Sequence, residues 1–400
     1  MAFLNELSDG KKMVDKVFKA AIKAREAKVN FGDDAVVDAT LGTLFDENGT
    51  FVAFDSVWGP YEKIDKITKA RYASSIQGNP GYRDAVYKWL FGNEKVECEI
   101  VVSPGGAGAI SSSMHNMLNP GQSVIKPSQG WGPYKTMAKE FGLNLISYNL
   151  FKNNQFDIEN FKDTCTAVMN DEGKVFVIIN DPCHNPTGYT MTTDEWTNII
   201  EFVNDLSVSG PVIILNDIAY VDYSTNPSWK DHFLRYRELN ENAMAIITFS
   251  LSKTFTAYGA RVGASIAITK NKAELAKYKD AAIYSARSIW STVNNSMMEL
   301  FSEISSDYTL YQNYINEKQN YIELLKERAK IFIEESEDVG LDLYPFREGF
   351  FATIKLEDSE KETINLQLQA NNIFTVEVDG GLRVALCSVP KRKLRGLAKR

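Results

Sequence analysis

The 400-residue sequence predicts an α/β fold: a large domain with a mainly parallel seven-stranded sheet between helices, and a smaller α+β domain formed by the two chain ends. Two observations carry this prediction. Short apolar runs alternate with helical stretches through the middle of the chain, and after Asn295 the sequence becomes rich in Glu, Lys, Leu and Tyr. We expect the large domain to span 48–300 and the small domain to combine 1–47 with 301–400.

Seven apolar runs predict the strands of the large sheet. Continuous rather than alternating hydrophobicity is typical of strands that are buried on both faces of a parallel sheet. Strands that alternate with helical stretches indicate βαβ units. The runs are Ile100–Val102, Ser123–Ile125, Leu143–Ser147, Val175–Ile179, Val212–Leu215, Ala245–Phe249 and Val262–Ile268.

The two ends of the chain predict the smaller domain. Ser296–Glu337 contains neither Pro nor Gly and predicts one or two long helices. Strand-like runs follow at Phe350–Leu356, Ile373–Val378 and Leu382–Val389. We expect an N-terminal helix over Lys11–Lys28 to pack with these strands.

Charge argues against a nucleic-acid partner. The formal net charge is −8, and no basic groove is visible in the sequence. The last ten residues are nevertheless basic, and we interpret them as a solvated C-terminal helix, with contact to RNA or a membrane as the alternative. Their basic side chains are Lys391, Arg392, Lys393, Arg395, Lys399 and Arg400.

Composition also bears on membranes, metals and location. No apolar run approaches the roughly 18 residues of a membrane span, and the N-terminus lacks the apolar core of a secretory signal. The 4 cysteines stand singly and the 3 histidines are scattered, which indicates neither a disulfide scaffold nor a zinc site. We expect a cytoplasmic protein with no metal and no membrane partner.

A glycine-rich segment follows the first predicted strand of the large sheet. In Val102-Ser-Pro-Gly-Gly-Ala-Gly-Ala-Ile110, a strand ends, glycines turn and a helix begins. Free backbone N–H groups and the helix dipole can hold a phosphate there, and a tight strand–helix turn is the alternative. A dinucleotide-binding fingerprint is disfavoured, because Ser111 occupies its third glycine position and no acid lies about 20 residues further on.

Two polar segments follow later strands. Asn185, in Asn180-Asp-Pro-Cys-His-Asn-Pro-Thr-Gly188, is held extended by Pro186, so its amide can donate to a ligand at the sheet edge. A simple Pro/Gly turn is the alternative. Asp217 ends a buried strand and therefore needs a cationic partner, and Tyr220 can point its hydroxyl to the same place.

Two basic residues complete the set. Lys253 lies just past a buried strand, where a lowered pKa suits Schiff-base chemistry, and the hydroxyls of Ser250 and Ser252 with Arg261 can form half of a phosphate cradle. Arg383 is a natural bidentate partner for a substrate carboxylate. Taken alone, Ser-x-Ser-Lys is usually a surface turn and an arginine on a strand is usually part of an ion pair.

In this order and spacing, the segments resemble those of the class I/II aminotransferases, the aspartate aminotransferase-like enzymes of the fold-type I pyridoxal-phosphate group. The resemblance covers nearly the whole chain. Its most specific parts are His-Asn-Pro-Thr-Gly, Asp-x-Ala-Tyr and Ser-x-Ser-Lys with the following Arg. It implies pyridoxal 5′-phosphate as cofactor and ping-pong transfer of an amino group from an L-amino acid to a 2-oxo acid.

The resemblance also implies roles around the cofactor. Lys253 matches the Schiff-base lysine, which then acts as general base, and Asp217 matches the acid that pairs with the pyridine nitrogen. Asn185 and Tyr220 match donors to the ring's phenolic oxygen, and Trp131 matches the aromatic that stacks on the ring. The residues that match the phosphate cup are Gly106, Ala107, Ser250, Ser252 and Arg261.

On the substrate side, Arg383 matches the arginine that binds the α-carboxylate, and Gly42 lies in a segment that resembles the one closing over the substrate. Tyr72 resembles a tyrosine that reaches the phosphate from the second subunit, which implies a homodimer with shared active sites. Arg287 aligns with an arginine that binds a distal carboxylate across the dimer, or else is an ordinary surface arginine. The first case predicts aspartate and glutamate as substrates, and the second favours aromatic or large apolar amino acids.

The sequence departs from the aspartate aminotransferase pattern at two positions. Ala107 stands where those enzymes often have a hydroxyl, and Tyr134 stands where many have a histidine behind the pyridine-nitrogen acid. Neither change should abolish cofactor binding. The same scaffold also suits a carbon–sulfur lyase or a decarboxylase, which is the alternative function.

Overall fold

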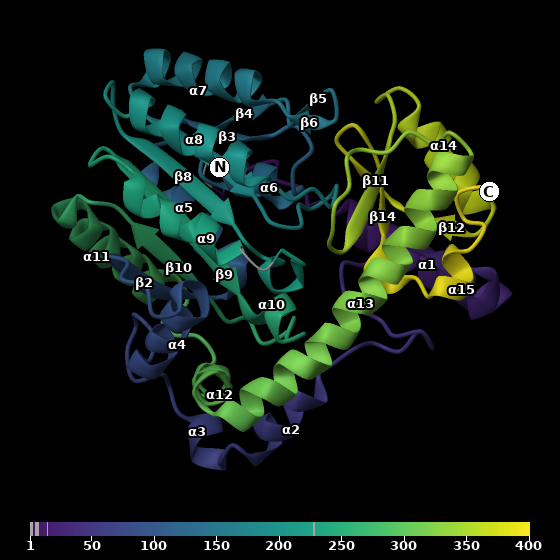
Figure 1. The fold of residues 1–400 in the computed structure, drawn as a ribbon, viewed down its shortest axis with the longest axis horizontal. Helices are drawn as coiled ribbons and strands as arrows, with labels where there is room; N and C mark the ends of the chain where they lie inside the picture. The colour runs from purple at the N-terminus through teal and green to yellow at the C-terminus, as the bar shows by residue number, and fades with distance from the viewer. Residues whose placement is uncertain (1–2, 5–7, 14, 227–228) are drawn as a thin grey trace.

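The large sheet has the seven strands that the sequence predicts. In the computed structural model, which describes residues 3–4, 8–13, 15–226 and 229–400, their order is β2-β10-β9-β8-β7-β3-β4. All neighbouring pairs are parallel except the two made by β10, which runs antiparallel to β2 and β9 (Figure 1). The strands are β2 (Cys98–Ser103), β3 (Ser123–Pro127), β4 (Asn144–Tyr148), β7 (Val175–Asn180), β8 (Val212–Asp217), β9 (Ala243–Ser250) and β10 (Gly263–Ile268).

Helices cover both faces of this sheet, as continuous hydrophobicity predicts. On β7, Val175, Val177 and Ile179 pack in one core with α7 (Ile158–Glu172) and α8 (Thr193–Leu206). The alternate residues Phe176 and Ile178 pack in a second core. The helices of that second core are α5 (Gly105–Met117), α6 (Pro133–Glu140) and α11 (Lys272–Ile289).

Shorter elements surround the sheet. The helices are α2 (Asp55–Lys63), α3 (Lys66–Ala70), α4 (Pro80–Phe91), α9 (Trp229–Leu234), α10 (Leu251–Thr254) and α12 (Asn295–Ser306). Single turns of 3₁₀-helix occur at η1 (Asp33–Ala35), η2 (Val221–Tyr223), η3 (Arg235–Glu238) and η4 (Leu386–Ser388), and β5 (Phe151–Lys152) pairs with β6 (Gln155–Phe156).

The small antiparallel sheet is built by the C-terminal part of the chain. Its order is β11-β14-β13, and a separate parallel pair joins β1 to β12. The strands are β1 (Val37–Asp38), β11 (Phe351–Lys355), β12 (Ile373–Phe374), β13 (Val376–Val378) and β14 (Gly381–Ala385). The helices beside them are α1 (Lys16–Phe31), α13 (Tyr308–Asp338), α14 (Lys361–Ala370) and α15 (Lys391–Leu394).

The predicted helical stretch after Asn295 forms two helices. Asp307 separates α12 from α13, and its carboxylate accepts a hydrogen bond from Leu310 N at 2.8 Å, which caps α13. In Figure 1, α13 runs from beside α2 and α12 to the small sheet. This helix therefore connects the two parts of the fold.

Several predicted elements differ in detail. The run Ile373–Val378 forms two strands rather than one, because β12 pairs with β1 whereas β13 pairs with β14. The run Leu382–Val389 leaves the sheet after Ala385, and the N-terminal helix begins at Lys16 rather than Lys11.

The basic tail is less solvated than the sequence suggests. Arg392 Nη1 lies 2.7 Å from Asp34 Oδ1, and Lys393 Nζ lies 2.6 Å from Asp33 Oδ2. Lys391 is likewise paired with Glu327, so the three charges on this helix of four residues are paired within the chain. The remaining tail charges are exposed, at Arg395, Lys399 and Arg400. In the described part of the chain, none of the helices combines the length and apolar character that crossing a bilayer requires.

Candidate active site

Three neighbouring strands bring three predicted residues to one edge of the large sheet. β7, β8 and β9 are adjacent and parallel, with Asn180 opposite Asp217 and Asp217 opposite Thr248. At their carboxyl ends lie Asn185 in the loop after β7, Asp217 as the last residue of β8 and Lys253 in α10, which follows β9 directly. Ligands of open α/β sheets bind at this edge, so the topology itself places the three side chains where a ligand enters.

The antiparallel strand β10 explains how Arg261 reaches the same edge. Because β10 runs in the opposite direction, its first residue, Gly263, lies between Ser103 at the end of β2 and Ser250 at the end of β9. Arg261 precedes it and donates from Nη1 to Ser252 Oγ at 3.1 Å. The strand ends thus bring the glycine-rich segment and the Ser-x-Ser-Lys segment together around one guanidinium.

Backbone geometry keeps this cradle open. Gly105 has a φ of +73°, and a Cβ there would lie 2.5 Å from Arg261 Nη2, so a side chain would displace the guanidinium. No side chain caps the N-terminus of α5, where Gly106 and Ala107 supply backbone N–H groups. An uncapped helix N-terminus beside an arginine and two serine hydroxyls is a favourable place for a phosphate.

Lys253 is held in an environment that favours its neutral amine. Burial lowers the pKa of Lys253 from 10.5 to about 8. Its Nζ lies 4.8 Å from the centre of the Tyr258 ring and 5.6 Å from that of Tyr220, and makes no salt bridge with any described residue. About one tenth of this amine is therefore unprotonated and nucleophilic at pH 7, a far larger share than at the ordinary pKa of a lysine.

Asp217 is a buried carboxylate bound by neutral donors. Its Oδ2 accepts a hydrogen bond from Tyr134 Oη at 2.6 Å, and its Oδ1 accepts one from Ala219 N at 3.2 Å. Burial raises the pKa of Asp217, while the Tyr134 hydrogen bond opposes that effect. Within the described residues Asp217 has no salt bridge, which suits a carboxylate whose cation comes from a bound ring nitrogen.

Arg383 lies on β14 and meets Asn185 across the two parts of the fold. Its Nη1 donates to Asn185 Oδ1 at 3.2 Å and its Nη2 donates to Thr40 O at 2.8 Å, while its buried Nε has no partner among the described residues. The guanidinium carbon also lies 4.3 Å from the centre of the Phe351 ring. The group is thus fixed in orientation and retains donors for a carboxylate.

Gly42 closes this side of the site. A Cβ at Gly42 would lie 2.8 Å from Phe351 Cζ and 3.9 Å from Tyr220 Oη. The segment therefore approaches the site with its backbone alone. Tyr220 itself is buried, and its ring packs on Phe350 and Phe351 with centroid distances of 5.1 and 5.6 Å.

Three predicted residues stand further out. Trp131 packs edge-on against Tyr134, with ring centroids 5.4 Å apart. Tyr72 is 83% exposed, and Arg287 lies exposed near the end of α11, where its Nη1 donates to Ser291 Oγ at 2.6 Å. No contact within this chain joins Tyr72 or Arg287 to Lys253, so their roles at the site remain predictions.

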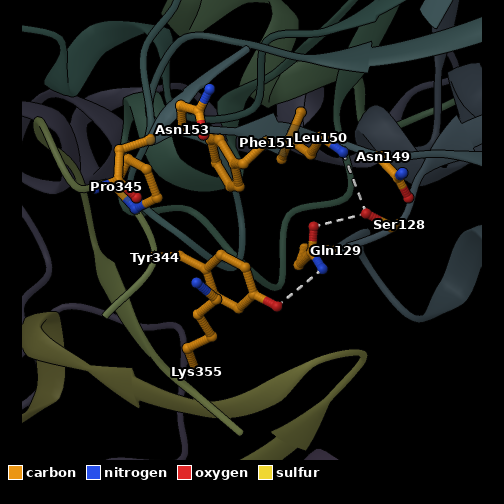
Figure 2. Close-up of a pocket in the computed structure, with 10 residues that line it drawn as sticks. Ser128, Gln129, Asn149, Leu150, Phe151, Asn153, Tyr344, Pro345 and Lys355 are labelled. Atoms are coloured by element: carbon orange, nitrogen blue, oxygen red, sulfur yellow. Dashed lines mark hydrogen bonds between the residues drawn. The ribbon is translucent and has the colours of Figure 1, made fainter. Parts of the chain in front are cut away.

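A cavity of about 380 Å³ lies beside the segment that leads to Trp131. Figure 2 shows that Gln129 and Tyr344 point toward one another across it, and Gln129 Nε2 donates to Tyr344 Oη at 3.1 Å. Its walls come from the segment after β3, from the chain that leads from β4 through β5 to β6, from the segment before β11 and from the last residue of β11. The lining residues are Ser128, Gln129, Asn149, Leu150, Phe151, Asn153, Asn154, Tyr344, Pro345 and Lys355.

Sequence reasoning missed two aromatic residues at the site. Tyr258 faces Lys253, and its Oη accepts a hydrogen bond from Leu44 N at 3.0 Å. Phe351 stacks under Arg383. Tyr258 is only five residues after Lys253, which was the available signal, whereas Phe351 reaches Arg383 through the pairing of β11 with β14 and left no local signal.

These residues fit pyridoxal phosphate. The phosphate would lie at the start of α5 with Arg261, Ser250 and Ser252, and Asp217 would face the ring nitrogen. Lys253 would hold the aldehyde carbon. The unpartnered Nε of Arg383 remains available for the carboxylate of an amino acid.

Comparisons with known proteins agree with this geometry. The chain is similar to the aspartate aminotransferase of Haemophilus influenzae (23% identity over 330 residues, 80% of this chain and 79% of the relative). It is also similar to the aromatic-amino-acid aminotransferase of Pseudomonas aeruginosa (26% identity over 211 residues, 52% of this chain and 51% of the relative).

Solved structures show the same similarity. The aminotransferase of Anaerococcus prevotii superimposes with a TM-score of 0.95 at 29% identity, covering 100% of this chain and 98% of the other. An aromatic-amino-acid aminotransferase of Burkholderia pseudomallei, covalently bound to pyridoxal phosphate, has the same fold (TM-score 0.81, 19% identity, 99% and 98% coverage). The sequence pattern of the family aminotransferase class I and II matches residues 46–400, so this chain belongs to that family and is a pyridoxal-phosphate-dependent aminotransferase.

Proposed function

We propose that Lys253, Asp217, Asn185, Tyr220 and Arg383 carry out the transamination. The observation that supports this most directly is the placement of a half-buried lysine with a lowered pKa and a buried carboxylate at the carboxyl ends of adjacent strands. When bound, pyridoxal phosphate supplies an aldehyde carbon for the amine and a ring that delocalises the electrons left when the Cα proton departs.

The chain's own groups then perform the proton transfers. Lys253 Nζ would hold the cofactor covalently until the amino group of the substrate replaces it. The released amine would then be the base that accepts the proton from the substrate Cα and the acid that gives the same proton back. The carboxylate of Asp217 holds the proton on the ring nitrogen, and Asn185 and Tyr220 donate to the phenolic oxygen.

Arg383 fixes which bond is broken. A substrate carboxylate bound to its guanidinium would orient the Cα–H bond toward Lys253, so that this bond would break. Water would supply the carbonyl oxygen of the 2-oxo acid product, which would leave before a second 2-oxo acid binds to the same groups, and this order gives ping-pong kinetics. The backbone at Gly42 closes over the bound substrate and limits access of water.

The amino donor is either dicarboxylic or aromatic in this proposal. Relatives named aspartate aminotransferase and aromatic-amino-acid aminotransferase support both classes. Arg287 would distinguish them if it reaches the active site of a partner subunit. Arg287→Ala should then weaken binding of aspartate and glutamate and leave aromatic donors unaffected.

We propose a homodimer with shared active sites. Ile67 and Tyr72 flank the end of α3, Tyr284 and Ile289 flank Arg287 on α11, and all four side chains are exposed in this chain. A complementation experiment tests this directly. Hybrids of a Lys253→Ala subunit and a Tyr72→Ala subunit should regain activity, because one of their two sites contains both native residues.

The domain division stays part of the proposal, with 48–300 binding the cofactor and 1–47 with 301–400 closing over the substrate. The 4 free cysteines support a cytoplasmic location. Neither point affects the chemistry of the site.

The decisive experiment is the visible absorption spectrum of the purified protein with pyridoxal phosphate. The bound cofactor should absorb in the visible range, and the band should bleach when the correct L-amino acid is added without a 2-oxo acid. A band that recovers while pyruvate with ammonia, or carbon dioxide, accumulates would support the lyase or decarboxylase instead. A protein that gains no band would refute the role of Lys253.

A further inference from the structure

Arg328 is a fully buried arginine on α13 that makes five hydrogen bonds. Its Nε and Nη2 donate to Glu47 Oε1 at 3.0 and 2.7 Å, and Nη2 also donates to Asp46 O at 3.1 Å. Its Nη1 donates to Cys387 O at 2.9 Å and to Leu386 O at 3.4 Å. The guanidinium has five N–H groups, so every donor is used.

The acceptors belong to two segments that are far apart in the sequence. Asp46 and Glu47 end the segment that contains Gly42, and Leu386 and Cys387 follow directly after the strand that carries Arg383. Arg328 therefore hydrogen-bonds to the ends of both segments. Glu47 also accepts a hydrogen bond from Lys391 N at 3.1 Å.

Two backbone hydrogen bonds join the two segments near the substrate site. Ala385 N donates to Ala39 O at 3.0 Å, and Phe45 N donates to Cys387 O at 3.0 Å. Next to the first of these contacts, Arg383 Nη2 donates to Thr40 O. A shift of one segment along the other would therefore move the Arg383 guanidinium relative to the backbone at Gly42.

We propose that Arg328 is a positioning residue for the substrate: it fixes the register of the Gly42 segment against the Arg383 strand and so aligns both for the α-carboxylate. The inference rests on the proposed role of Arg383. An arginine is required because its planar fork serves acceptors on both segments at once, whereas a lysine ammonium has three donors at a single point. Arg328 itself touches neither substrate nor cofactor.

The test compares Arg328→Lys with the milder Glu47→Gln, which keeps the shape of one acceptor. The assay is steady-state transamination of an amino acid that bleaches the wild-type holoenzyme, with a saturating 2-oxo acid as acceptor. For Arg328→Lys we expect KM for the amino acid to rise about tenfold, and for Glu47→Gln about threefold. Both changes weaken the charge-assisted hydrogen bonds by which Arg328 holds the Gly42 segment against the strand of Arg383. We expect kcat and the visible band of the bound cofactor to change little.

A matched control is Lys326→Ala, which removes an exposed cation from the same helix. The Nζ of Lys326 lies 2.9 Å from Glu323 Oε1, and among the described residues it hydrogen-bonds to neither of the two segments. It should leave KM unchanged. A purely structural role for Arg328 would reduce the melting temperature and the active fraction of the enzyme but not KM, because KM does not depend on how much protein is folded.

A double-mutant cycle with Arg383→Lys separates the mechanisms further. If Arg328 acts through Arg383, Arg328→Lys should raise KM by less than about twofold in the Arg383→Lys background. The inference would be overturned if Arg328→Lys raised KM by the same factor with and without Arg383→Lys. It would also be overturned if Glu47→Gln and folded Arg328→Lys protein both kept the wild-type KM. Either result would leave the proposed function intact. Failure of the wild-type holoenzyme to bleach with any amino acid would overturn both.

Discussion

The hydrogen bond from Tyr134 to Asp217 leads to a sharp prediction. Tyr134 is fully buried on α6, and its hydroxyl donates to Asp217 Oδ2 at 2.6 Å. Tyr134→Phe removes one oxygen atom and keeps the ring that packs against Trp131. The change therefore isolates the hydroxyl from the packing.

The expected loss follows from the kind of hydrogen bond removed. A buried hydrogen bond to a charged acceptor contributes about 2 kcal/mol, and nothing else in the described structure replaces this donor to Oδ2. Since burial already raises the pKa of Asp217, losing the donor raises that pKa further. The carboxylate then holds the ring nitrogen proton less well, and proton abstraction at Cα should slow about tenfold or more.

The assay has two readouts. Single-turnover bleaching of the visible band gives the rate of the half-reaction, and the pH dependence of the same band in the unreacted holoenzyme reports the charge near the ring nitrogen. Tyr148→Phe is the matched control, because its buried hydroxyl donates to the neutral carbonyl of Ile178 at 3.2 Å. It should cost about 1 kcal/mol of stability and leave the half-reaction unchanged.

One pattern of results would refute this reasoning. If Tyr134→Phe bleaches within about twofold of the wild-type rate and its band keeps the wild-type pH dependence, the hydroxyl does not act on Asp217 during the reaction. Equal losses in Tyr134→Phe and Tyr148→Phe would likewise show that only packing stability was measured.

The remaining predictions concern the other site residues. Lys253→Ala should keep the fold, by circular dichroism, and lose both the visible band and transamination, and near-native turnover would exclude Lys253. Because burial lowers the pKa of Lys253 to about 8, covalent capture of pyridoxal phosphate by the cofactor-free protein should rise through about pH 8 and then level off. The free energy of unfolding of that protein should increase between pH 8 and 10.5, because in this range only the unfolded chain keeps the Lys253 proton. Arg383→Ala should weaken amino-acid binding by about 2–5 kcal/mol, measured as the apparent Kd in the half-reaction, and unchanged kinetics would remove it from the site. Gly42→Ala should raise KM, because its Cβ would lie 2.8 Å from Phe351 Cζ, and unaltered KM would show that the segment moves freely.

The fold was predictable from the sequence where hydrophobicity is a local signal. All seven strands of the large sheet coincide with predicted apolar runs. β3, β7, β8, β9 and β10 are buried throughout, whereas β2 is buried only from Ile100 onward and the edge strand β4 is partly exposed. The split between β12 and β13 was not predictable, because the residues between Ile373 and Val378 stay apolar at alternate positions while the strand changes partner from β1 to β14. Strand pairing is a long-range choice that no local pattern expresses.

The site was predictable to the extent that each residue follows a strand. Asn185, Asp217 and Lys253 each come after an apolar run, and the topology of a parallel sheet joins such positions. The contacts that tune them were not visible. Tyr134 contacts Asp217 across 83 residues, and Arg328 contacts Glu47 across 281 residues.

Charge burial explains why those distant contacts matter for the chemistry. Asp217 and Arg383 are buried and Lys253 is half-buried, and loss of hydration shifts the pKa of each toward its neutral form. In the proposed mechanism a neutral lysine is useful, because it can attack a carbonyl carbon, whereas Asp217 and Arg383 are useful only when charged. Asp217 and Arg383 are accordingly bound by distant polar groups: the Tyr134 hydroxyl on the carboxylate, and the Thr40 and Asn185 oxygens on the guanidinium. Lys253 has aromatic rings around its amine instead. The same burial that creates the nucleophile therefore requires the long-range hydrogen bonds that keep its two partners ionised.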